Sequence, residues 1–193
     1  MLALLKKKFP EKKEFFINCD FLKFDPKEIF GLGRFRLVGN IPYNISSPIL
    51  GWCENHYEQI VDMHFMLQKE FALRCLGTEK TSSYGRLSVI CNYLYEVEIL
   101  KDIEREYFEP KPKVNSTLIK ITPHDRHKMF HKKYALFQKV LSICFASPRK
   151  KILSALKKID LASEKFDFDI NKRAEELEIN NFFEILNLYE SKL

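Results

Sequence analysis

The segment Asn40-Ile41-Pro42-Tyr43 places an amide, a proline and an aromatic ring directly after Phe35–Gly39, an apolar run typical of a buried strand. Proline lacks a backbone N–H, fixes its own φ and pushes the preceding residue into an extended conformation. We therefore expect a rigid corner that aims the Asn40 side-chain carbonyl and a neighbouring backbone carbonyl at one point, beside the Tyr43 ring. The alternative is an ordinary tight turn leading into a helix capped by Ser47-Pro48.

Two acceptors beside an aromatic face suit an aromatic amine such as the exocyclic amine of adenine. That nitrogen is a weak nucleophile because its lone pair is delocalised into the ring. Acceptors for both N–H bonds favour a more tetrahedral nitrogen that can attack, and this chemistry requires neither a metal nor a covalent intermediate. The corner follows a strand, and open α/β sheets bind their ligands at the carboxyl ends of strands.

Strand and helix patterns alternate before residue 122, which predicts an α/β part with a parallel sheet. The expected strands are Glu14–Asn18, Phe35–Gly39, Val61–Leu67, Val97–Leu100 and Thr117–Thr122. The expected helices run from Ser47-Pro48 to about Tyr57, over Gln68–Leu76, from Tyr84 to about Tyr93, from His131 through Cys144, from Ser147-Pro148, and once or twice within 171–191. A boundary near Thr122 separates residues 1–122 from a helical part, residues 123–193.

Composition excludes several classes of protein. The chain has 193 residues, 46% of them hydrophobic, and lacks the ~20-residue apolar run that a membrane span needs. The order of charges at the start is wrong for a secretory signal, which predicts a cytoplasmic protein. The five cysteines are odd in number and form no CxxC pair, so neither a disulfide framework nor a zinc site is expected. His64 lies in an apolar strand and is expected in the core.

Charge is segregated along the chain. Residues 126–158 contain ten Lys and Arg and no acid, while 1–125 carry a net charge of +1 and 159–193 a net charge of −5. Such a cationic stretch favours a phosphate backbone as its partner. The alternative is that this stretch packs against the acidic segment that follows it.

Four segments in order resemble signatures of the rRNA adenine N6-dimethyltransferase family. They are Asn40–Ile49, Asp62–Glu70, Tyr84–Ser88 and Phe108–Ser116, and Phe145–Leu153 is similar to the family's basic C-terminal helix. The resemblance covers essentially the whole chain and is stronger for the small-subunit branch, the dimethyladenosine transferases, than for the branch acting on large-subunit rRNA.

The resemblance implies a role for individual residues. Asn40 and the carbonyl of Ile41 or Pro42 would hold the target amine, and Tyr43 and Phe108 would stack on the extruded base. Asp20, together with Asn40, would bind S-adenosylmethionine. The residues expected to contact RNA are Arg86, Lys111, Lys113, Arg149, Lys150 and Lys151. Structural ion pairs are an equal alternative for Arg86, Lys111 and Lys113.

Two parts of the family pattern have no counterpart here. A glycine-rich turn after a first strand is absent, since Gly31-Leu32-Gly33 precedes a strand, and no acidic residue ends a second strand before Asp20. The resemblance therefore implies a Rossmann-like methyltransferase sheet lacking its first two strands, followed by a small all-helical domain. We expect Glu14–Asn18 to pair out of place or pack loosely, and Asp20 to be poorly held.

The implied function is S-adenosylmethionine-dependent N6,N6-dimethylation of two adjacent adenines near the 3′ end of small-subunit rRNA. This would make the chain a methyltransferase of ribosome biogenesis whose partner is the rRNA or the immature small subunit, and a monomer without metal. Two alternatives stay open: an RNA-binding module that does not hold the cofactor, and a large-subunit rRNA adenine methyltransferase.

Overall fold

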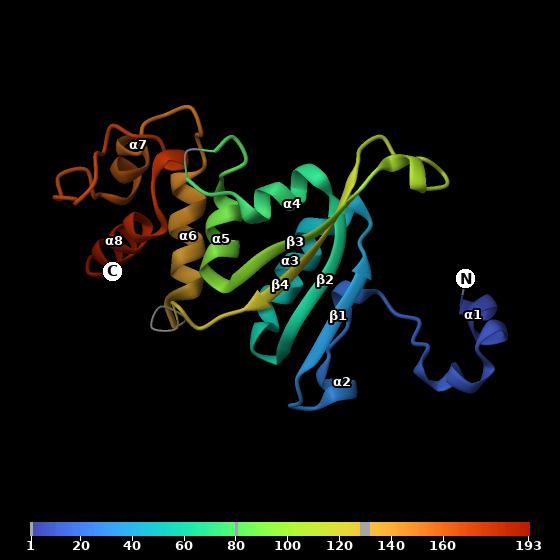
Figure 1. The fold of residues 1–193 in the computed structure, drawn as a ribbon. Helices are drawn as coiled ribbons and strands as arrows, with labels where there is room; N and C mark the ends of the chain where they lie inside the picture. Colours follow the sequence, from blue (N-terminus) through green and yellow to red (C-terminus); the bar gives the residue numbers. More distant parts are fainter. Residues whose placement is uncertain (1, 80, 128–131) are drawn as a thin grey trace.

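The computed structural model describes residues 2–79, 81–127 and 132–193 and contains one four-stranded sheet (Figure 1). The strand order is β1-β2-β4-β3. The strands are β1 Phe35–Asn40, β2 Ile60–Gln68, β3 Tyr95–Ile103 and β4 Ser116–Pro123. The helices are α1 Leu2–Lys8, α2 Lys27–Phe30, α3 Ser46–Asn55, α4 Lys69–Leu76, α5 Arg86–Leu94, α6 Tyr134–Cys144, α7 Leu153–Leu156 and α8 Ile179–Glu190. Four of the five expected strands are confirmed.

The sheet is mixed, so the expectation of a parallel sheet is only partly right. β1 and β2 are parallel, whereas β4 is antiparallel to both β2 and β3. A parallel pair needs a long crossover, and α3 provides one between β1 and β2. β3 and β4 are joined by residues 104–115, which hold only a short 3₁₀ turn, and such a connection returns the chain antiparallel.

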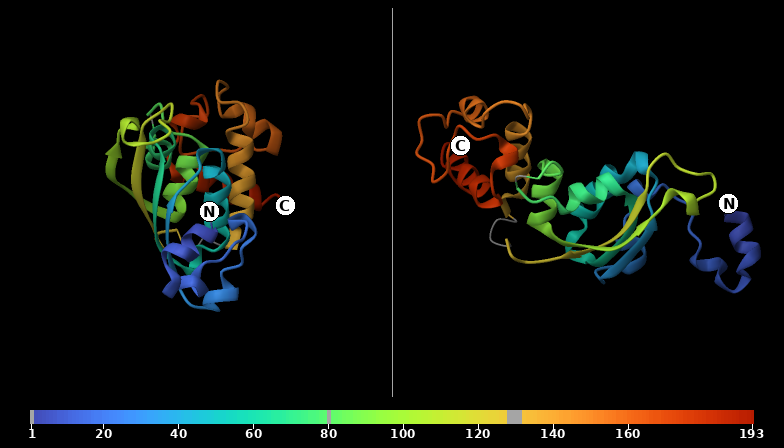
Figure 2. Two further views of the ribbon diagram at one scale, coloured as in Figure 1. Left: turned by 90° about the vertical axis from the view of Figure 1, so that its right-hand side faces the viewer. Right: turned by 45° about the horizontal axis from the view of Figure 1, so that its top comes forward.

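Helices α3, α4 and α5 lie on one face of the sheet, as both views of Figure 2 show. Met63, Phe65 and Leu67 of β2 alternate toward them and are fully buried or nearly so. Strand alternation then sends His64 to the other face, where its Nδ1 lies 3.6 Å from Asp62 Oδ1 and its side chain is 32% exposed. The expectation that His64 is a core residue was therefore wrong.

The helices that follow Pro123 pack beside α5. Tyr93 of α5 is fully buried, and its ring lies 5.4 Å from that of Tyr134 and 4.9 Å from that of Phe137, both in α6. His131, where the α6 pattern was expected to begin, lies outside the described residues. A single cluster of buried residues includes both parts of the chain. The division at residues 122 and 123 stays a prediction.

Two expected elements are absent from the described chain. Glu14–Asn18 is not a strand: a 3₁₀ helix covers Pro10–Phe15, and Phe15 and Ile17 are 71% and 53% exposed. A strand needs a neighbour for its N–H and C=O groups, and β1 pairs with β2 alone. The exposure agrees with the expected loose packing, and α1 lies well away from the sheet (Figure 1).

The basic segment after α6 does not begin a helix at Ser147-Pro148. Residues 145–150 form turns, and α7 starts only at Leu153. The backbone N–H groups of Ile152 and Leu153 donate to the carbonyls of Lys172 and Ile170, so pairing with a distant segment replaces the first helical turn. Among the described residues, no helix is long and apolar enough to cross a membrane.

The Tyr84 hydroxyl joins the sheet part to the C-terminal segment, because it donates to the Leu177 carbonyl at 2.9 Å while Tyr84 is 7% exposed. We expect Tyr84→Phe to lower the free energy of unfolding by about 1–2 kcal/mol, since the buried carbonyl loses its donor. Urea denaturation measures this. Tyr107→Phe, at a tyrosine that is 82% exposed, is the control and should change stability by less than about 0.5 kcal/mol. Equal effects of the two variants would contradict the assignment.

Candidate functional site

The corner after β1 has the predicted rigid form. The Ile41 N–H donates to the Met66 carbonyl at 3.1 Å, and the Ile41 side chain is buried, so the backbone is tied to β2 just past Asn40. Pro42 has φ −58° and ψ 128°, and a short 3₁₀ turn over Tyr43–Ile45 follows. Asn40 is exposed at the end of β1, available to a ligand.

The following helix begins one residue earlier than expected. α3 starts at Ser46, and no side-chain hydrogen bond caps it, so Ser47 is not its cap. The Ser46 hydroxyl instead donates back to the Tyr43 carbonyl at 3.3 Å. Pro48 sits in the first turn of α3, where a missing N–H costs nothing.

Tyr43 is fixed by a residue that the sequence analysis did not single out. Its hydroxyl lies 2.7 Å from the hydroxyl of Ser116, the first residue of β4, which is fully buried. Ser116 closes the segment that contains Phe108, so this hydrogen bond brings two of the family-like segments together. The only signal in the sequence was the position of Ser116 at the end of that segment.

Phe108 is half buried just after the 3₁₀ turn Arg105–Tyr107. Its N–H donates to the Arg105 carbonyl at 3.3 Å. In the described chain the rings of Tyr43 and Phe108 do not contact each other. Stacking of a base on the two rings stays a prediction.

The loop that contains Phe108 is held by charged side chains. Lys69 Nζ lies 2.6 Å from Asp102 Oδ2, and the Thr117 hydroxyl donates to Asp102 Oδ1 at 2.7 Å. These two donors hold the pKa of Asp102 below its usual value. Lys111 pairs with Glu106 at 2.6 Å, which is the structural role left open for it. Lys113 instead lines an open cleft of about 600 Å³ beside α4.

The two residues expected to hold the cofactor are both exposed. Asp20 is exposed, and its carboxylate accepts a hydrogen bond from the Leu22 N–H at 3.1 Å. Four cavities, beside α4, between α6 and α7, before β1 and β2, and at residues 81–82 and 173–176, are lined by residues other than Asp20 and Asn40. The exposed Asp20 carboxylate and Asn40 amide are polar groups that S-adenosylmethionine could contact, and their assignment to the cofactor stays a prediction.

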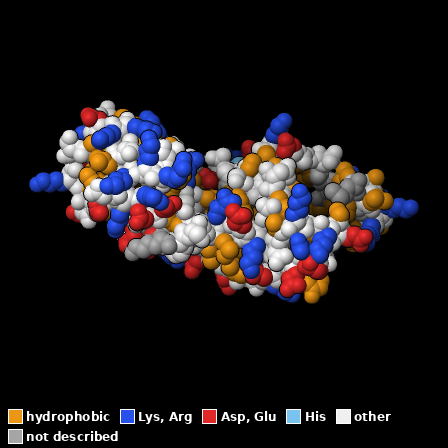
Figure 3. All heavy atoms as spheres, turned by 90° about the horizontal axis from the view of Figure 1, so that it is seen from above, with side chains coloured by type: hydrophobic (Ala, Val, Ile, Leu, Met, Phe, Trp, Pro, Cys, Tyr) orange, Lys and Arg blue, Asp and Glu red, His pale blue; other side chains and the backbone are white. Residues whose placement is uncertain are grey.

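The other residues expected to contact RNA lie on α5 and in the segment between α6 and α7. Arg86 opens α5, and its charge opposes the rise in the pKa of Glu54. Arg149, Lys150 and Lys151 are exposed between α6 and α7. Lys150 and Lys151 line a cavity of about 70 Å³, and Lys and Arg side chains are numerous over this helical part, at the left of Figure 3.

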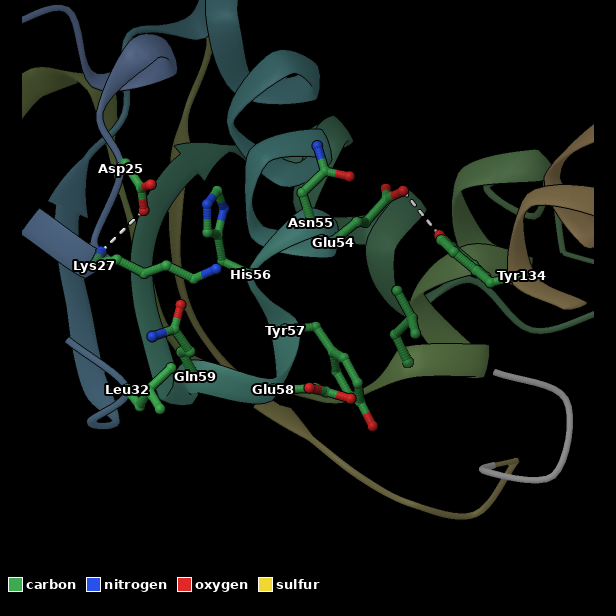
Figure 4. A pocket seen from close by; sticks show the side chains of 11 residues that line it. Asp25, Lys27, Leu32, Glu54, Asn55, His56, Tyr57, Glu58, Gln59 and Tyr134 are labelled. Atoms are coloured by element: carbon green, nitrogen blue, oxygen red, sulfur yellow. Dashed lines mark hydrogen bonds between the residues drawn. The ribbon is translucent and has the colours of Figure 1, made fainter. Parts of the chain in front are cut away.

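A larger cavity of about 500 Å³ lies at the opposite end of the sheet, where Leu32 and Gln59 precede the parallel strands β1 and β2 (Figure 4). Burial raises the pKa of Glu54 there, while Tyr134 and Gln138 donate to its carboxylate at 2.8 and 2.7 Å. Because β1 and β2 run parallel, their amino ends lie far from the Asn40 corner. This cavity is separate from the corner.

The parallel β1–β2 pair, the α3 crossover and the corner at the carboxyl end of β1 define a Rossmann-like methyltransferase fold. The structure is similar to a dimethyladenosine transferase from Plasmodium falciparum, with a TM-score of 0.77 and 23% identity over 99% of this chain and 78% of that one. It is also similar to the 23S rRNA methyltransferase ErmE, with a TM-score of 0.65 and 24% identity over 96% of this chain and 78% of that one. Both likenesses confirm the expected fold.

Residues 1–191 match the family described as ribosomal RNA adenine dimethylase, and the chain belongs to this family. It is 39% identical to ribosomal RNA small subunit methyltransferase A of Francisella tularensis subsp. novicida, over 88% of this chain and 67% of the relative. It is 36% identical to the protein of the same name from Saccharophagus degradans, over 97% of this chain and 71% of the relative. The resemblance to the small-subunit branch is thereby confirmed.

The Lys69–Asp102 pair predicts a titration. Because the folded-state pKa of Asp102 is lowered, the pair stabilises the protein above the unfolded-state pKa, and this contribution is lost as pH falls through the folded-state pKa. We expect Lys69→Gln to raise the Asp102 pKa toward its usual 3.8, measured by NMR titration of the carboxyl carbon. Lys101→Gln, at a neighbouring exposed lysine, should leave the Asp102 pKa lowered. An unchanged pKa in Lys69→Gln would refute the assigned cause.

Proposed function

We propose that this chain acts in the N6,N6-dimethylation of two adjacent adenines near the 3′ end of small-subunit rRNA, with S-adenosylmethionine as the methyl donor. The observation that carries the proposal is the corner itself. It is rigid, lies at the carboxyl end of a strand parallel to β2, and exposes the Asn40 side chain beside the half-buried Tyr43 ring. Family membership and the names of the relatives support the same reaction.

The corner acts on the target amine through its acceptors. The Asn40 side-chain carbonyl accepts one N–H of the adenine amine, and a backbone carbonyl accepts the other. The Pro42 carbonyl already accepts the Ile45 N–H at 3.0 Å, which favours the Ile41 carbonyl as the second acceptor. Tyr43 and Phe108 stack on the extruded base and exclude water from its faces.

The catalytic contribution of these residues is positioning and electrostatics. Accepting both N–H groups localises the amine lone pair, and a fixed base presents that lone pair in one direction. Asp20 and Asn40 are the residues proposed to contact the cofactor. Asp20 would act on the cofactor alone, and Asn40 would contact both the cofactor and the target amine.

The proposed partner is small-subunit rRNA or the immature small ribosomal subunit, in the cytoplasm, bound by a monomer. Arg86, Lys113 and the basic segment Arg149–Lys151 are the proposed RNA contacts. Lys111 contributes less, because Glu106 neutralises it. The small-subunit relatives do not favour a large-subunit substrate.

The acceptor role of Asn40 predicts a base-specific loss of binding. We expect Asn40→Ala to weaken binding of a labelled single-stranded RNA with two adjacent adenines by about tenfold, as loss of one hydrogen bond to a desolvated group implies. Fluorescence anisotropy measures the affinity. Asn44→Ala, at an exposed asparagine four residues on, is the matched control and should bind normally.

The same measurement is repeated with an RNA that carries purine in place of both adenines and therefore lacks their exocyclic amines. Asn40→Ala should then bind as the unchanged chain does, because the lost hydrogen bond has no donor. A tenfold loss on the purine RNA as well would assign Asn40 a structural role and defeat the proposal. Calorimetric titration with S-adenosylmethionine tests the donor separately.

The basic segment predicts a change in salt dependence. Replacing Arg149, Lys150 and Lys151 by Gln should reduce the slope of log affinity against log salt by about 2, at ~0.7 per phosphate contact with single-stranded RNA. Replacing the exposed Lys7, Lys12 and Lys13 by Gln removes the same charge and should leave the slope nearly unchanged. Equal slopes in the two triple variants would mean that net charge alone binds RNA.

A further inference from the structure

Tyr43 and Ser116 share a hydrogen bond across 73 residues of sequence, with 2.7 Å between the two hydroxyl oxygens. Within the described chain neither hydroxyl has another hydrogen-bond partner. Ser116 is fully buried, whereas the Tyr43 ring is partly exposed. The ring therefore has one fixed polar end and one accessible face.

The Ser116 end of this hydrogen bond is rigid. Ser116 pairs with Gln68 of β2 on one side and with Ile103 of β3 on the other. A residue held between two strands cannot follow the movements of an exposed turn. The Tyr43 hydroxyl is thus tied to the sheet and not to its own loop.

Thr117, the residue after Ser116, takes part in contacts that also hold the loop that contains Phe108. Thr117, 1% exposed, donates to Asp102, and Asp102 pairs with Lys69. The Lys69 N–H donates to the Asn115 carbonyl at 3.0 Å, so the end of the loop is fixed where it enters β4. One network therefore holds both sides of the acceptor site.

We propose that Ser116 is a positioning residue of the acceptor site: its hydroxyl fixes the orientation of the Tyr43 ring on which the target base stacks. This proposal rests on the proposed function. A tyrosine side chain turns about two torsions, and a hydrogen bond at the far end of the ring restricts both. If either hydroxyl were removed, the other would lose its hydrogen-bond partner. The Tyr43 ring would then turn away from the stacking orientation.

A double-mutant cycle tests the coupling. Ser116→Ala and Tyr43→Phe should each weaken binding of the adenine RNA by about fivefold, the usual size for one neutral hydrogen bond. The double variant should bind as each single variant does, because both changes remove the same interaction. Independent losses that multiply to about 25-fold, or no loss in the single variants, would overturn the proposal.

Ser88→Ala is the matched control for general destabilisation. Ser88 is also a fully buried serine, and its hydroxyl donates to the Arg74 carbonyl at 2.7 Å, in α4. We expect Ser88→Ala to lower stability and leave RNA affinity unchanged. Ser116→Thr keeps a hydroxyl and should restore affinity to within about twofold of the unchanged chain if it folds, which thermal unfolding checks.

Ring dynamics without RNA separate this proposal from the proposed function. In ¹³C-labelled tyrosine NMR of the free protein, Ser116→Ala should speed the motion of the Tyr43 ring, and Ser88→Ala should not. If the unchanged chain fails to discriminate adenine from purine RNA, the proposed function is wrong, and these rates still decide the role of Ser116. Equal Tyr43 ring rates in Ser116→Ala and the unchanged chain would overturn it.

Discussion

The parallel pairing of β1 with β2 is the constraint on which the rest of the structure depends. Two parallel neighbours cannot be joined by a tight turn, so the chain must leave β1, cross one face of the sheet as α3 and return at the start of β2. That crossover begins at the Asn40–Tyr43 corner and forces a change of direction within a few residues. Proline at position 42 suits this bend because it lacks the N–H that a continuing strand would need.

The position of β4 inside the sheet then completes the site. β4 returns between β2 and β3, and its first residue therefore lies beside the end of β2 and the corner. Ser116 reaches Tyr43 for this reason, although 73 residues separate them. The loop that enters β4 brings Phe108 to the same edge. The antiparallel strand β4 thus links the loop that contains Phe108 to a corner made by a parallel pair.

Charge is distributed by the fold as well as by the sequence. On and beside the loop that contains Phe108, Lys69 pairs with Asp102 and Lys111 pairs with Glu106. The segment Arg149–Lys151 is exposed, and the Lys151 ammonium donates to the side-chain carbonyl of Asn171 at 3.0 Å. In the proposed function, the helical part would attract a polyanion at long range, and the corner would select the base. The cavity of about 500 Å³ at the amino ends of β1 and β2 lies at the other end of the sheet from the corner.

The sequence by itself determined the family, four of the strands and the rigid corner, because these depend on local apolar periodicity and on the fixed φ of proline. The tertiary structure decided the rest. Glu14–Asn18 has the apolar pattern of a strand, but a strand exists only where it is paired, and in the described chain this segment pairs with none of the four strands. Ser147-Pro148 has a helix-start signal, yet the N–H groups of Ile152 and Leu153 pair with residues some 20 positions away. Likewise, Ser116 contacts Tyr43 because the strand order places the two residues together. The sequence could not predict this contact, because a hydrogen bond between distant residues produces no periodic pattern in a sequence.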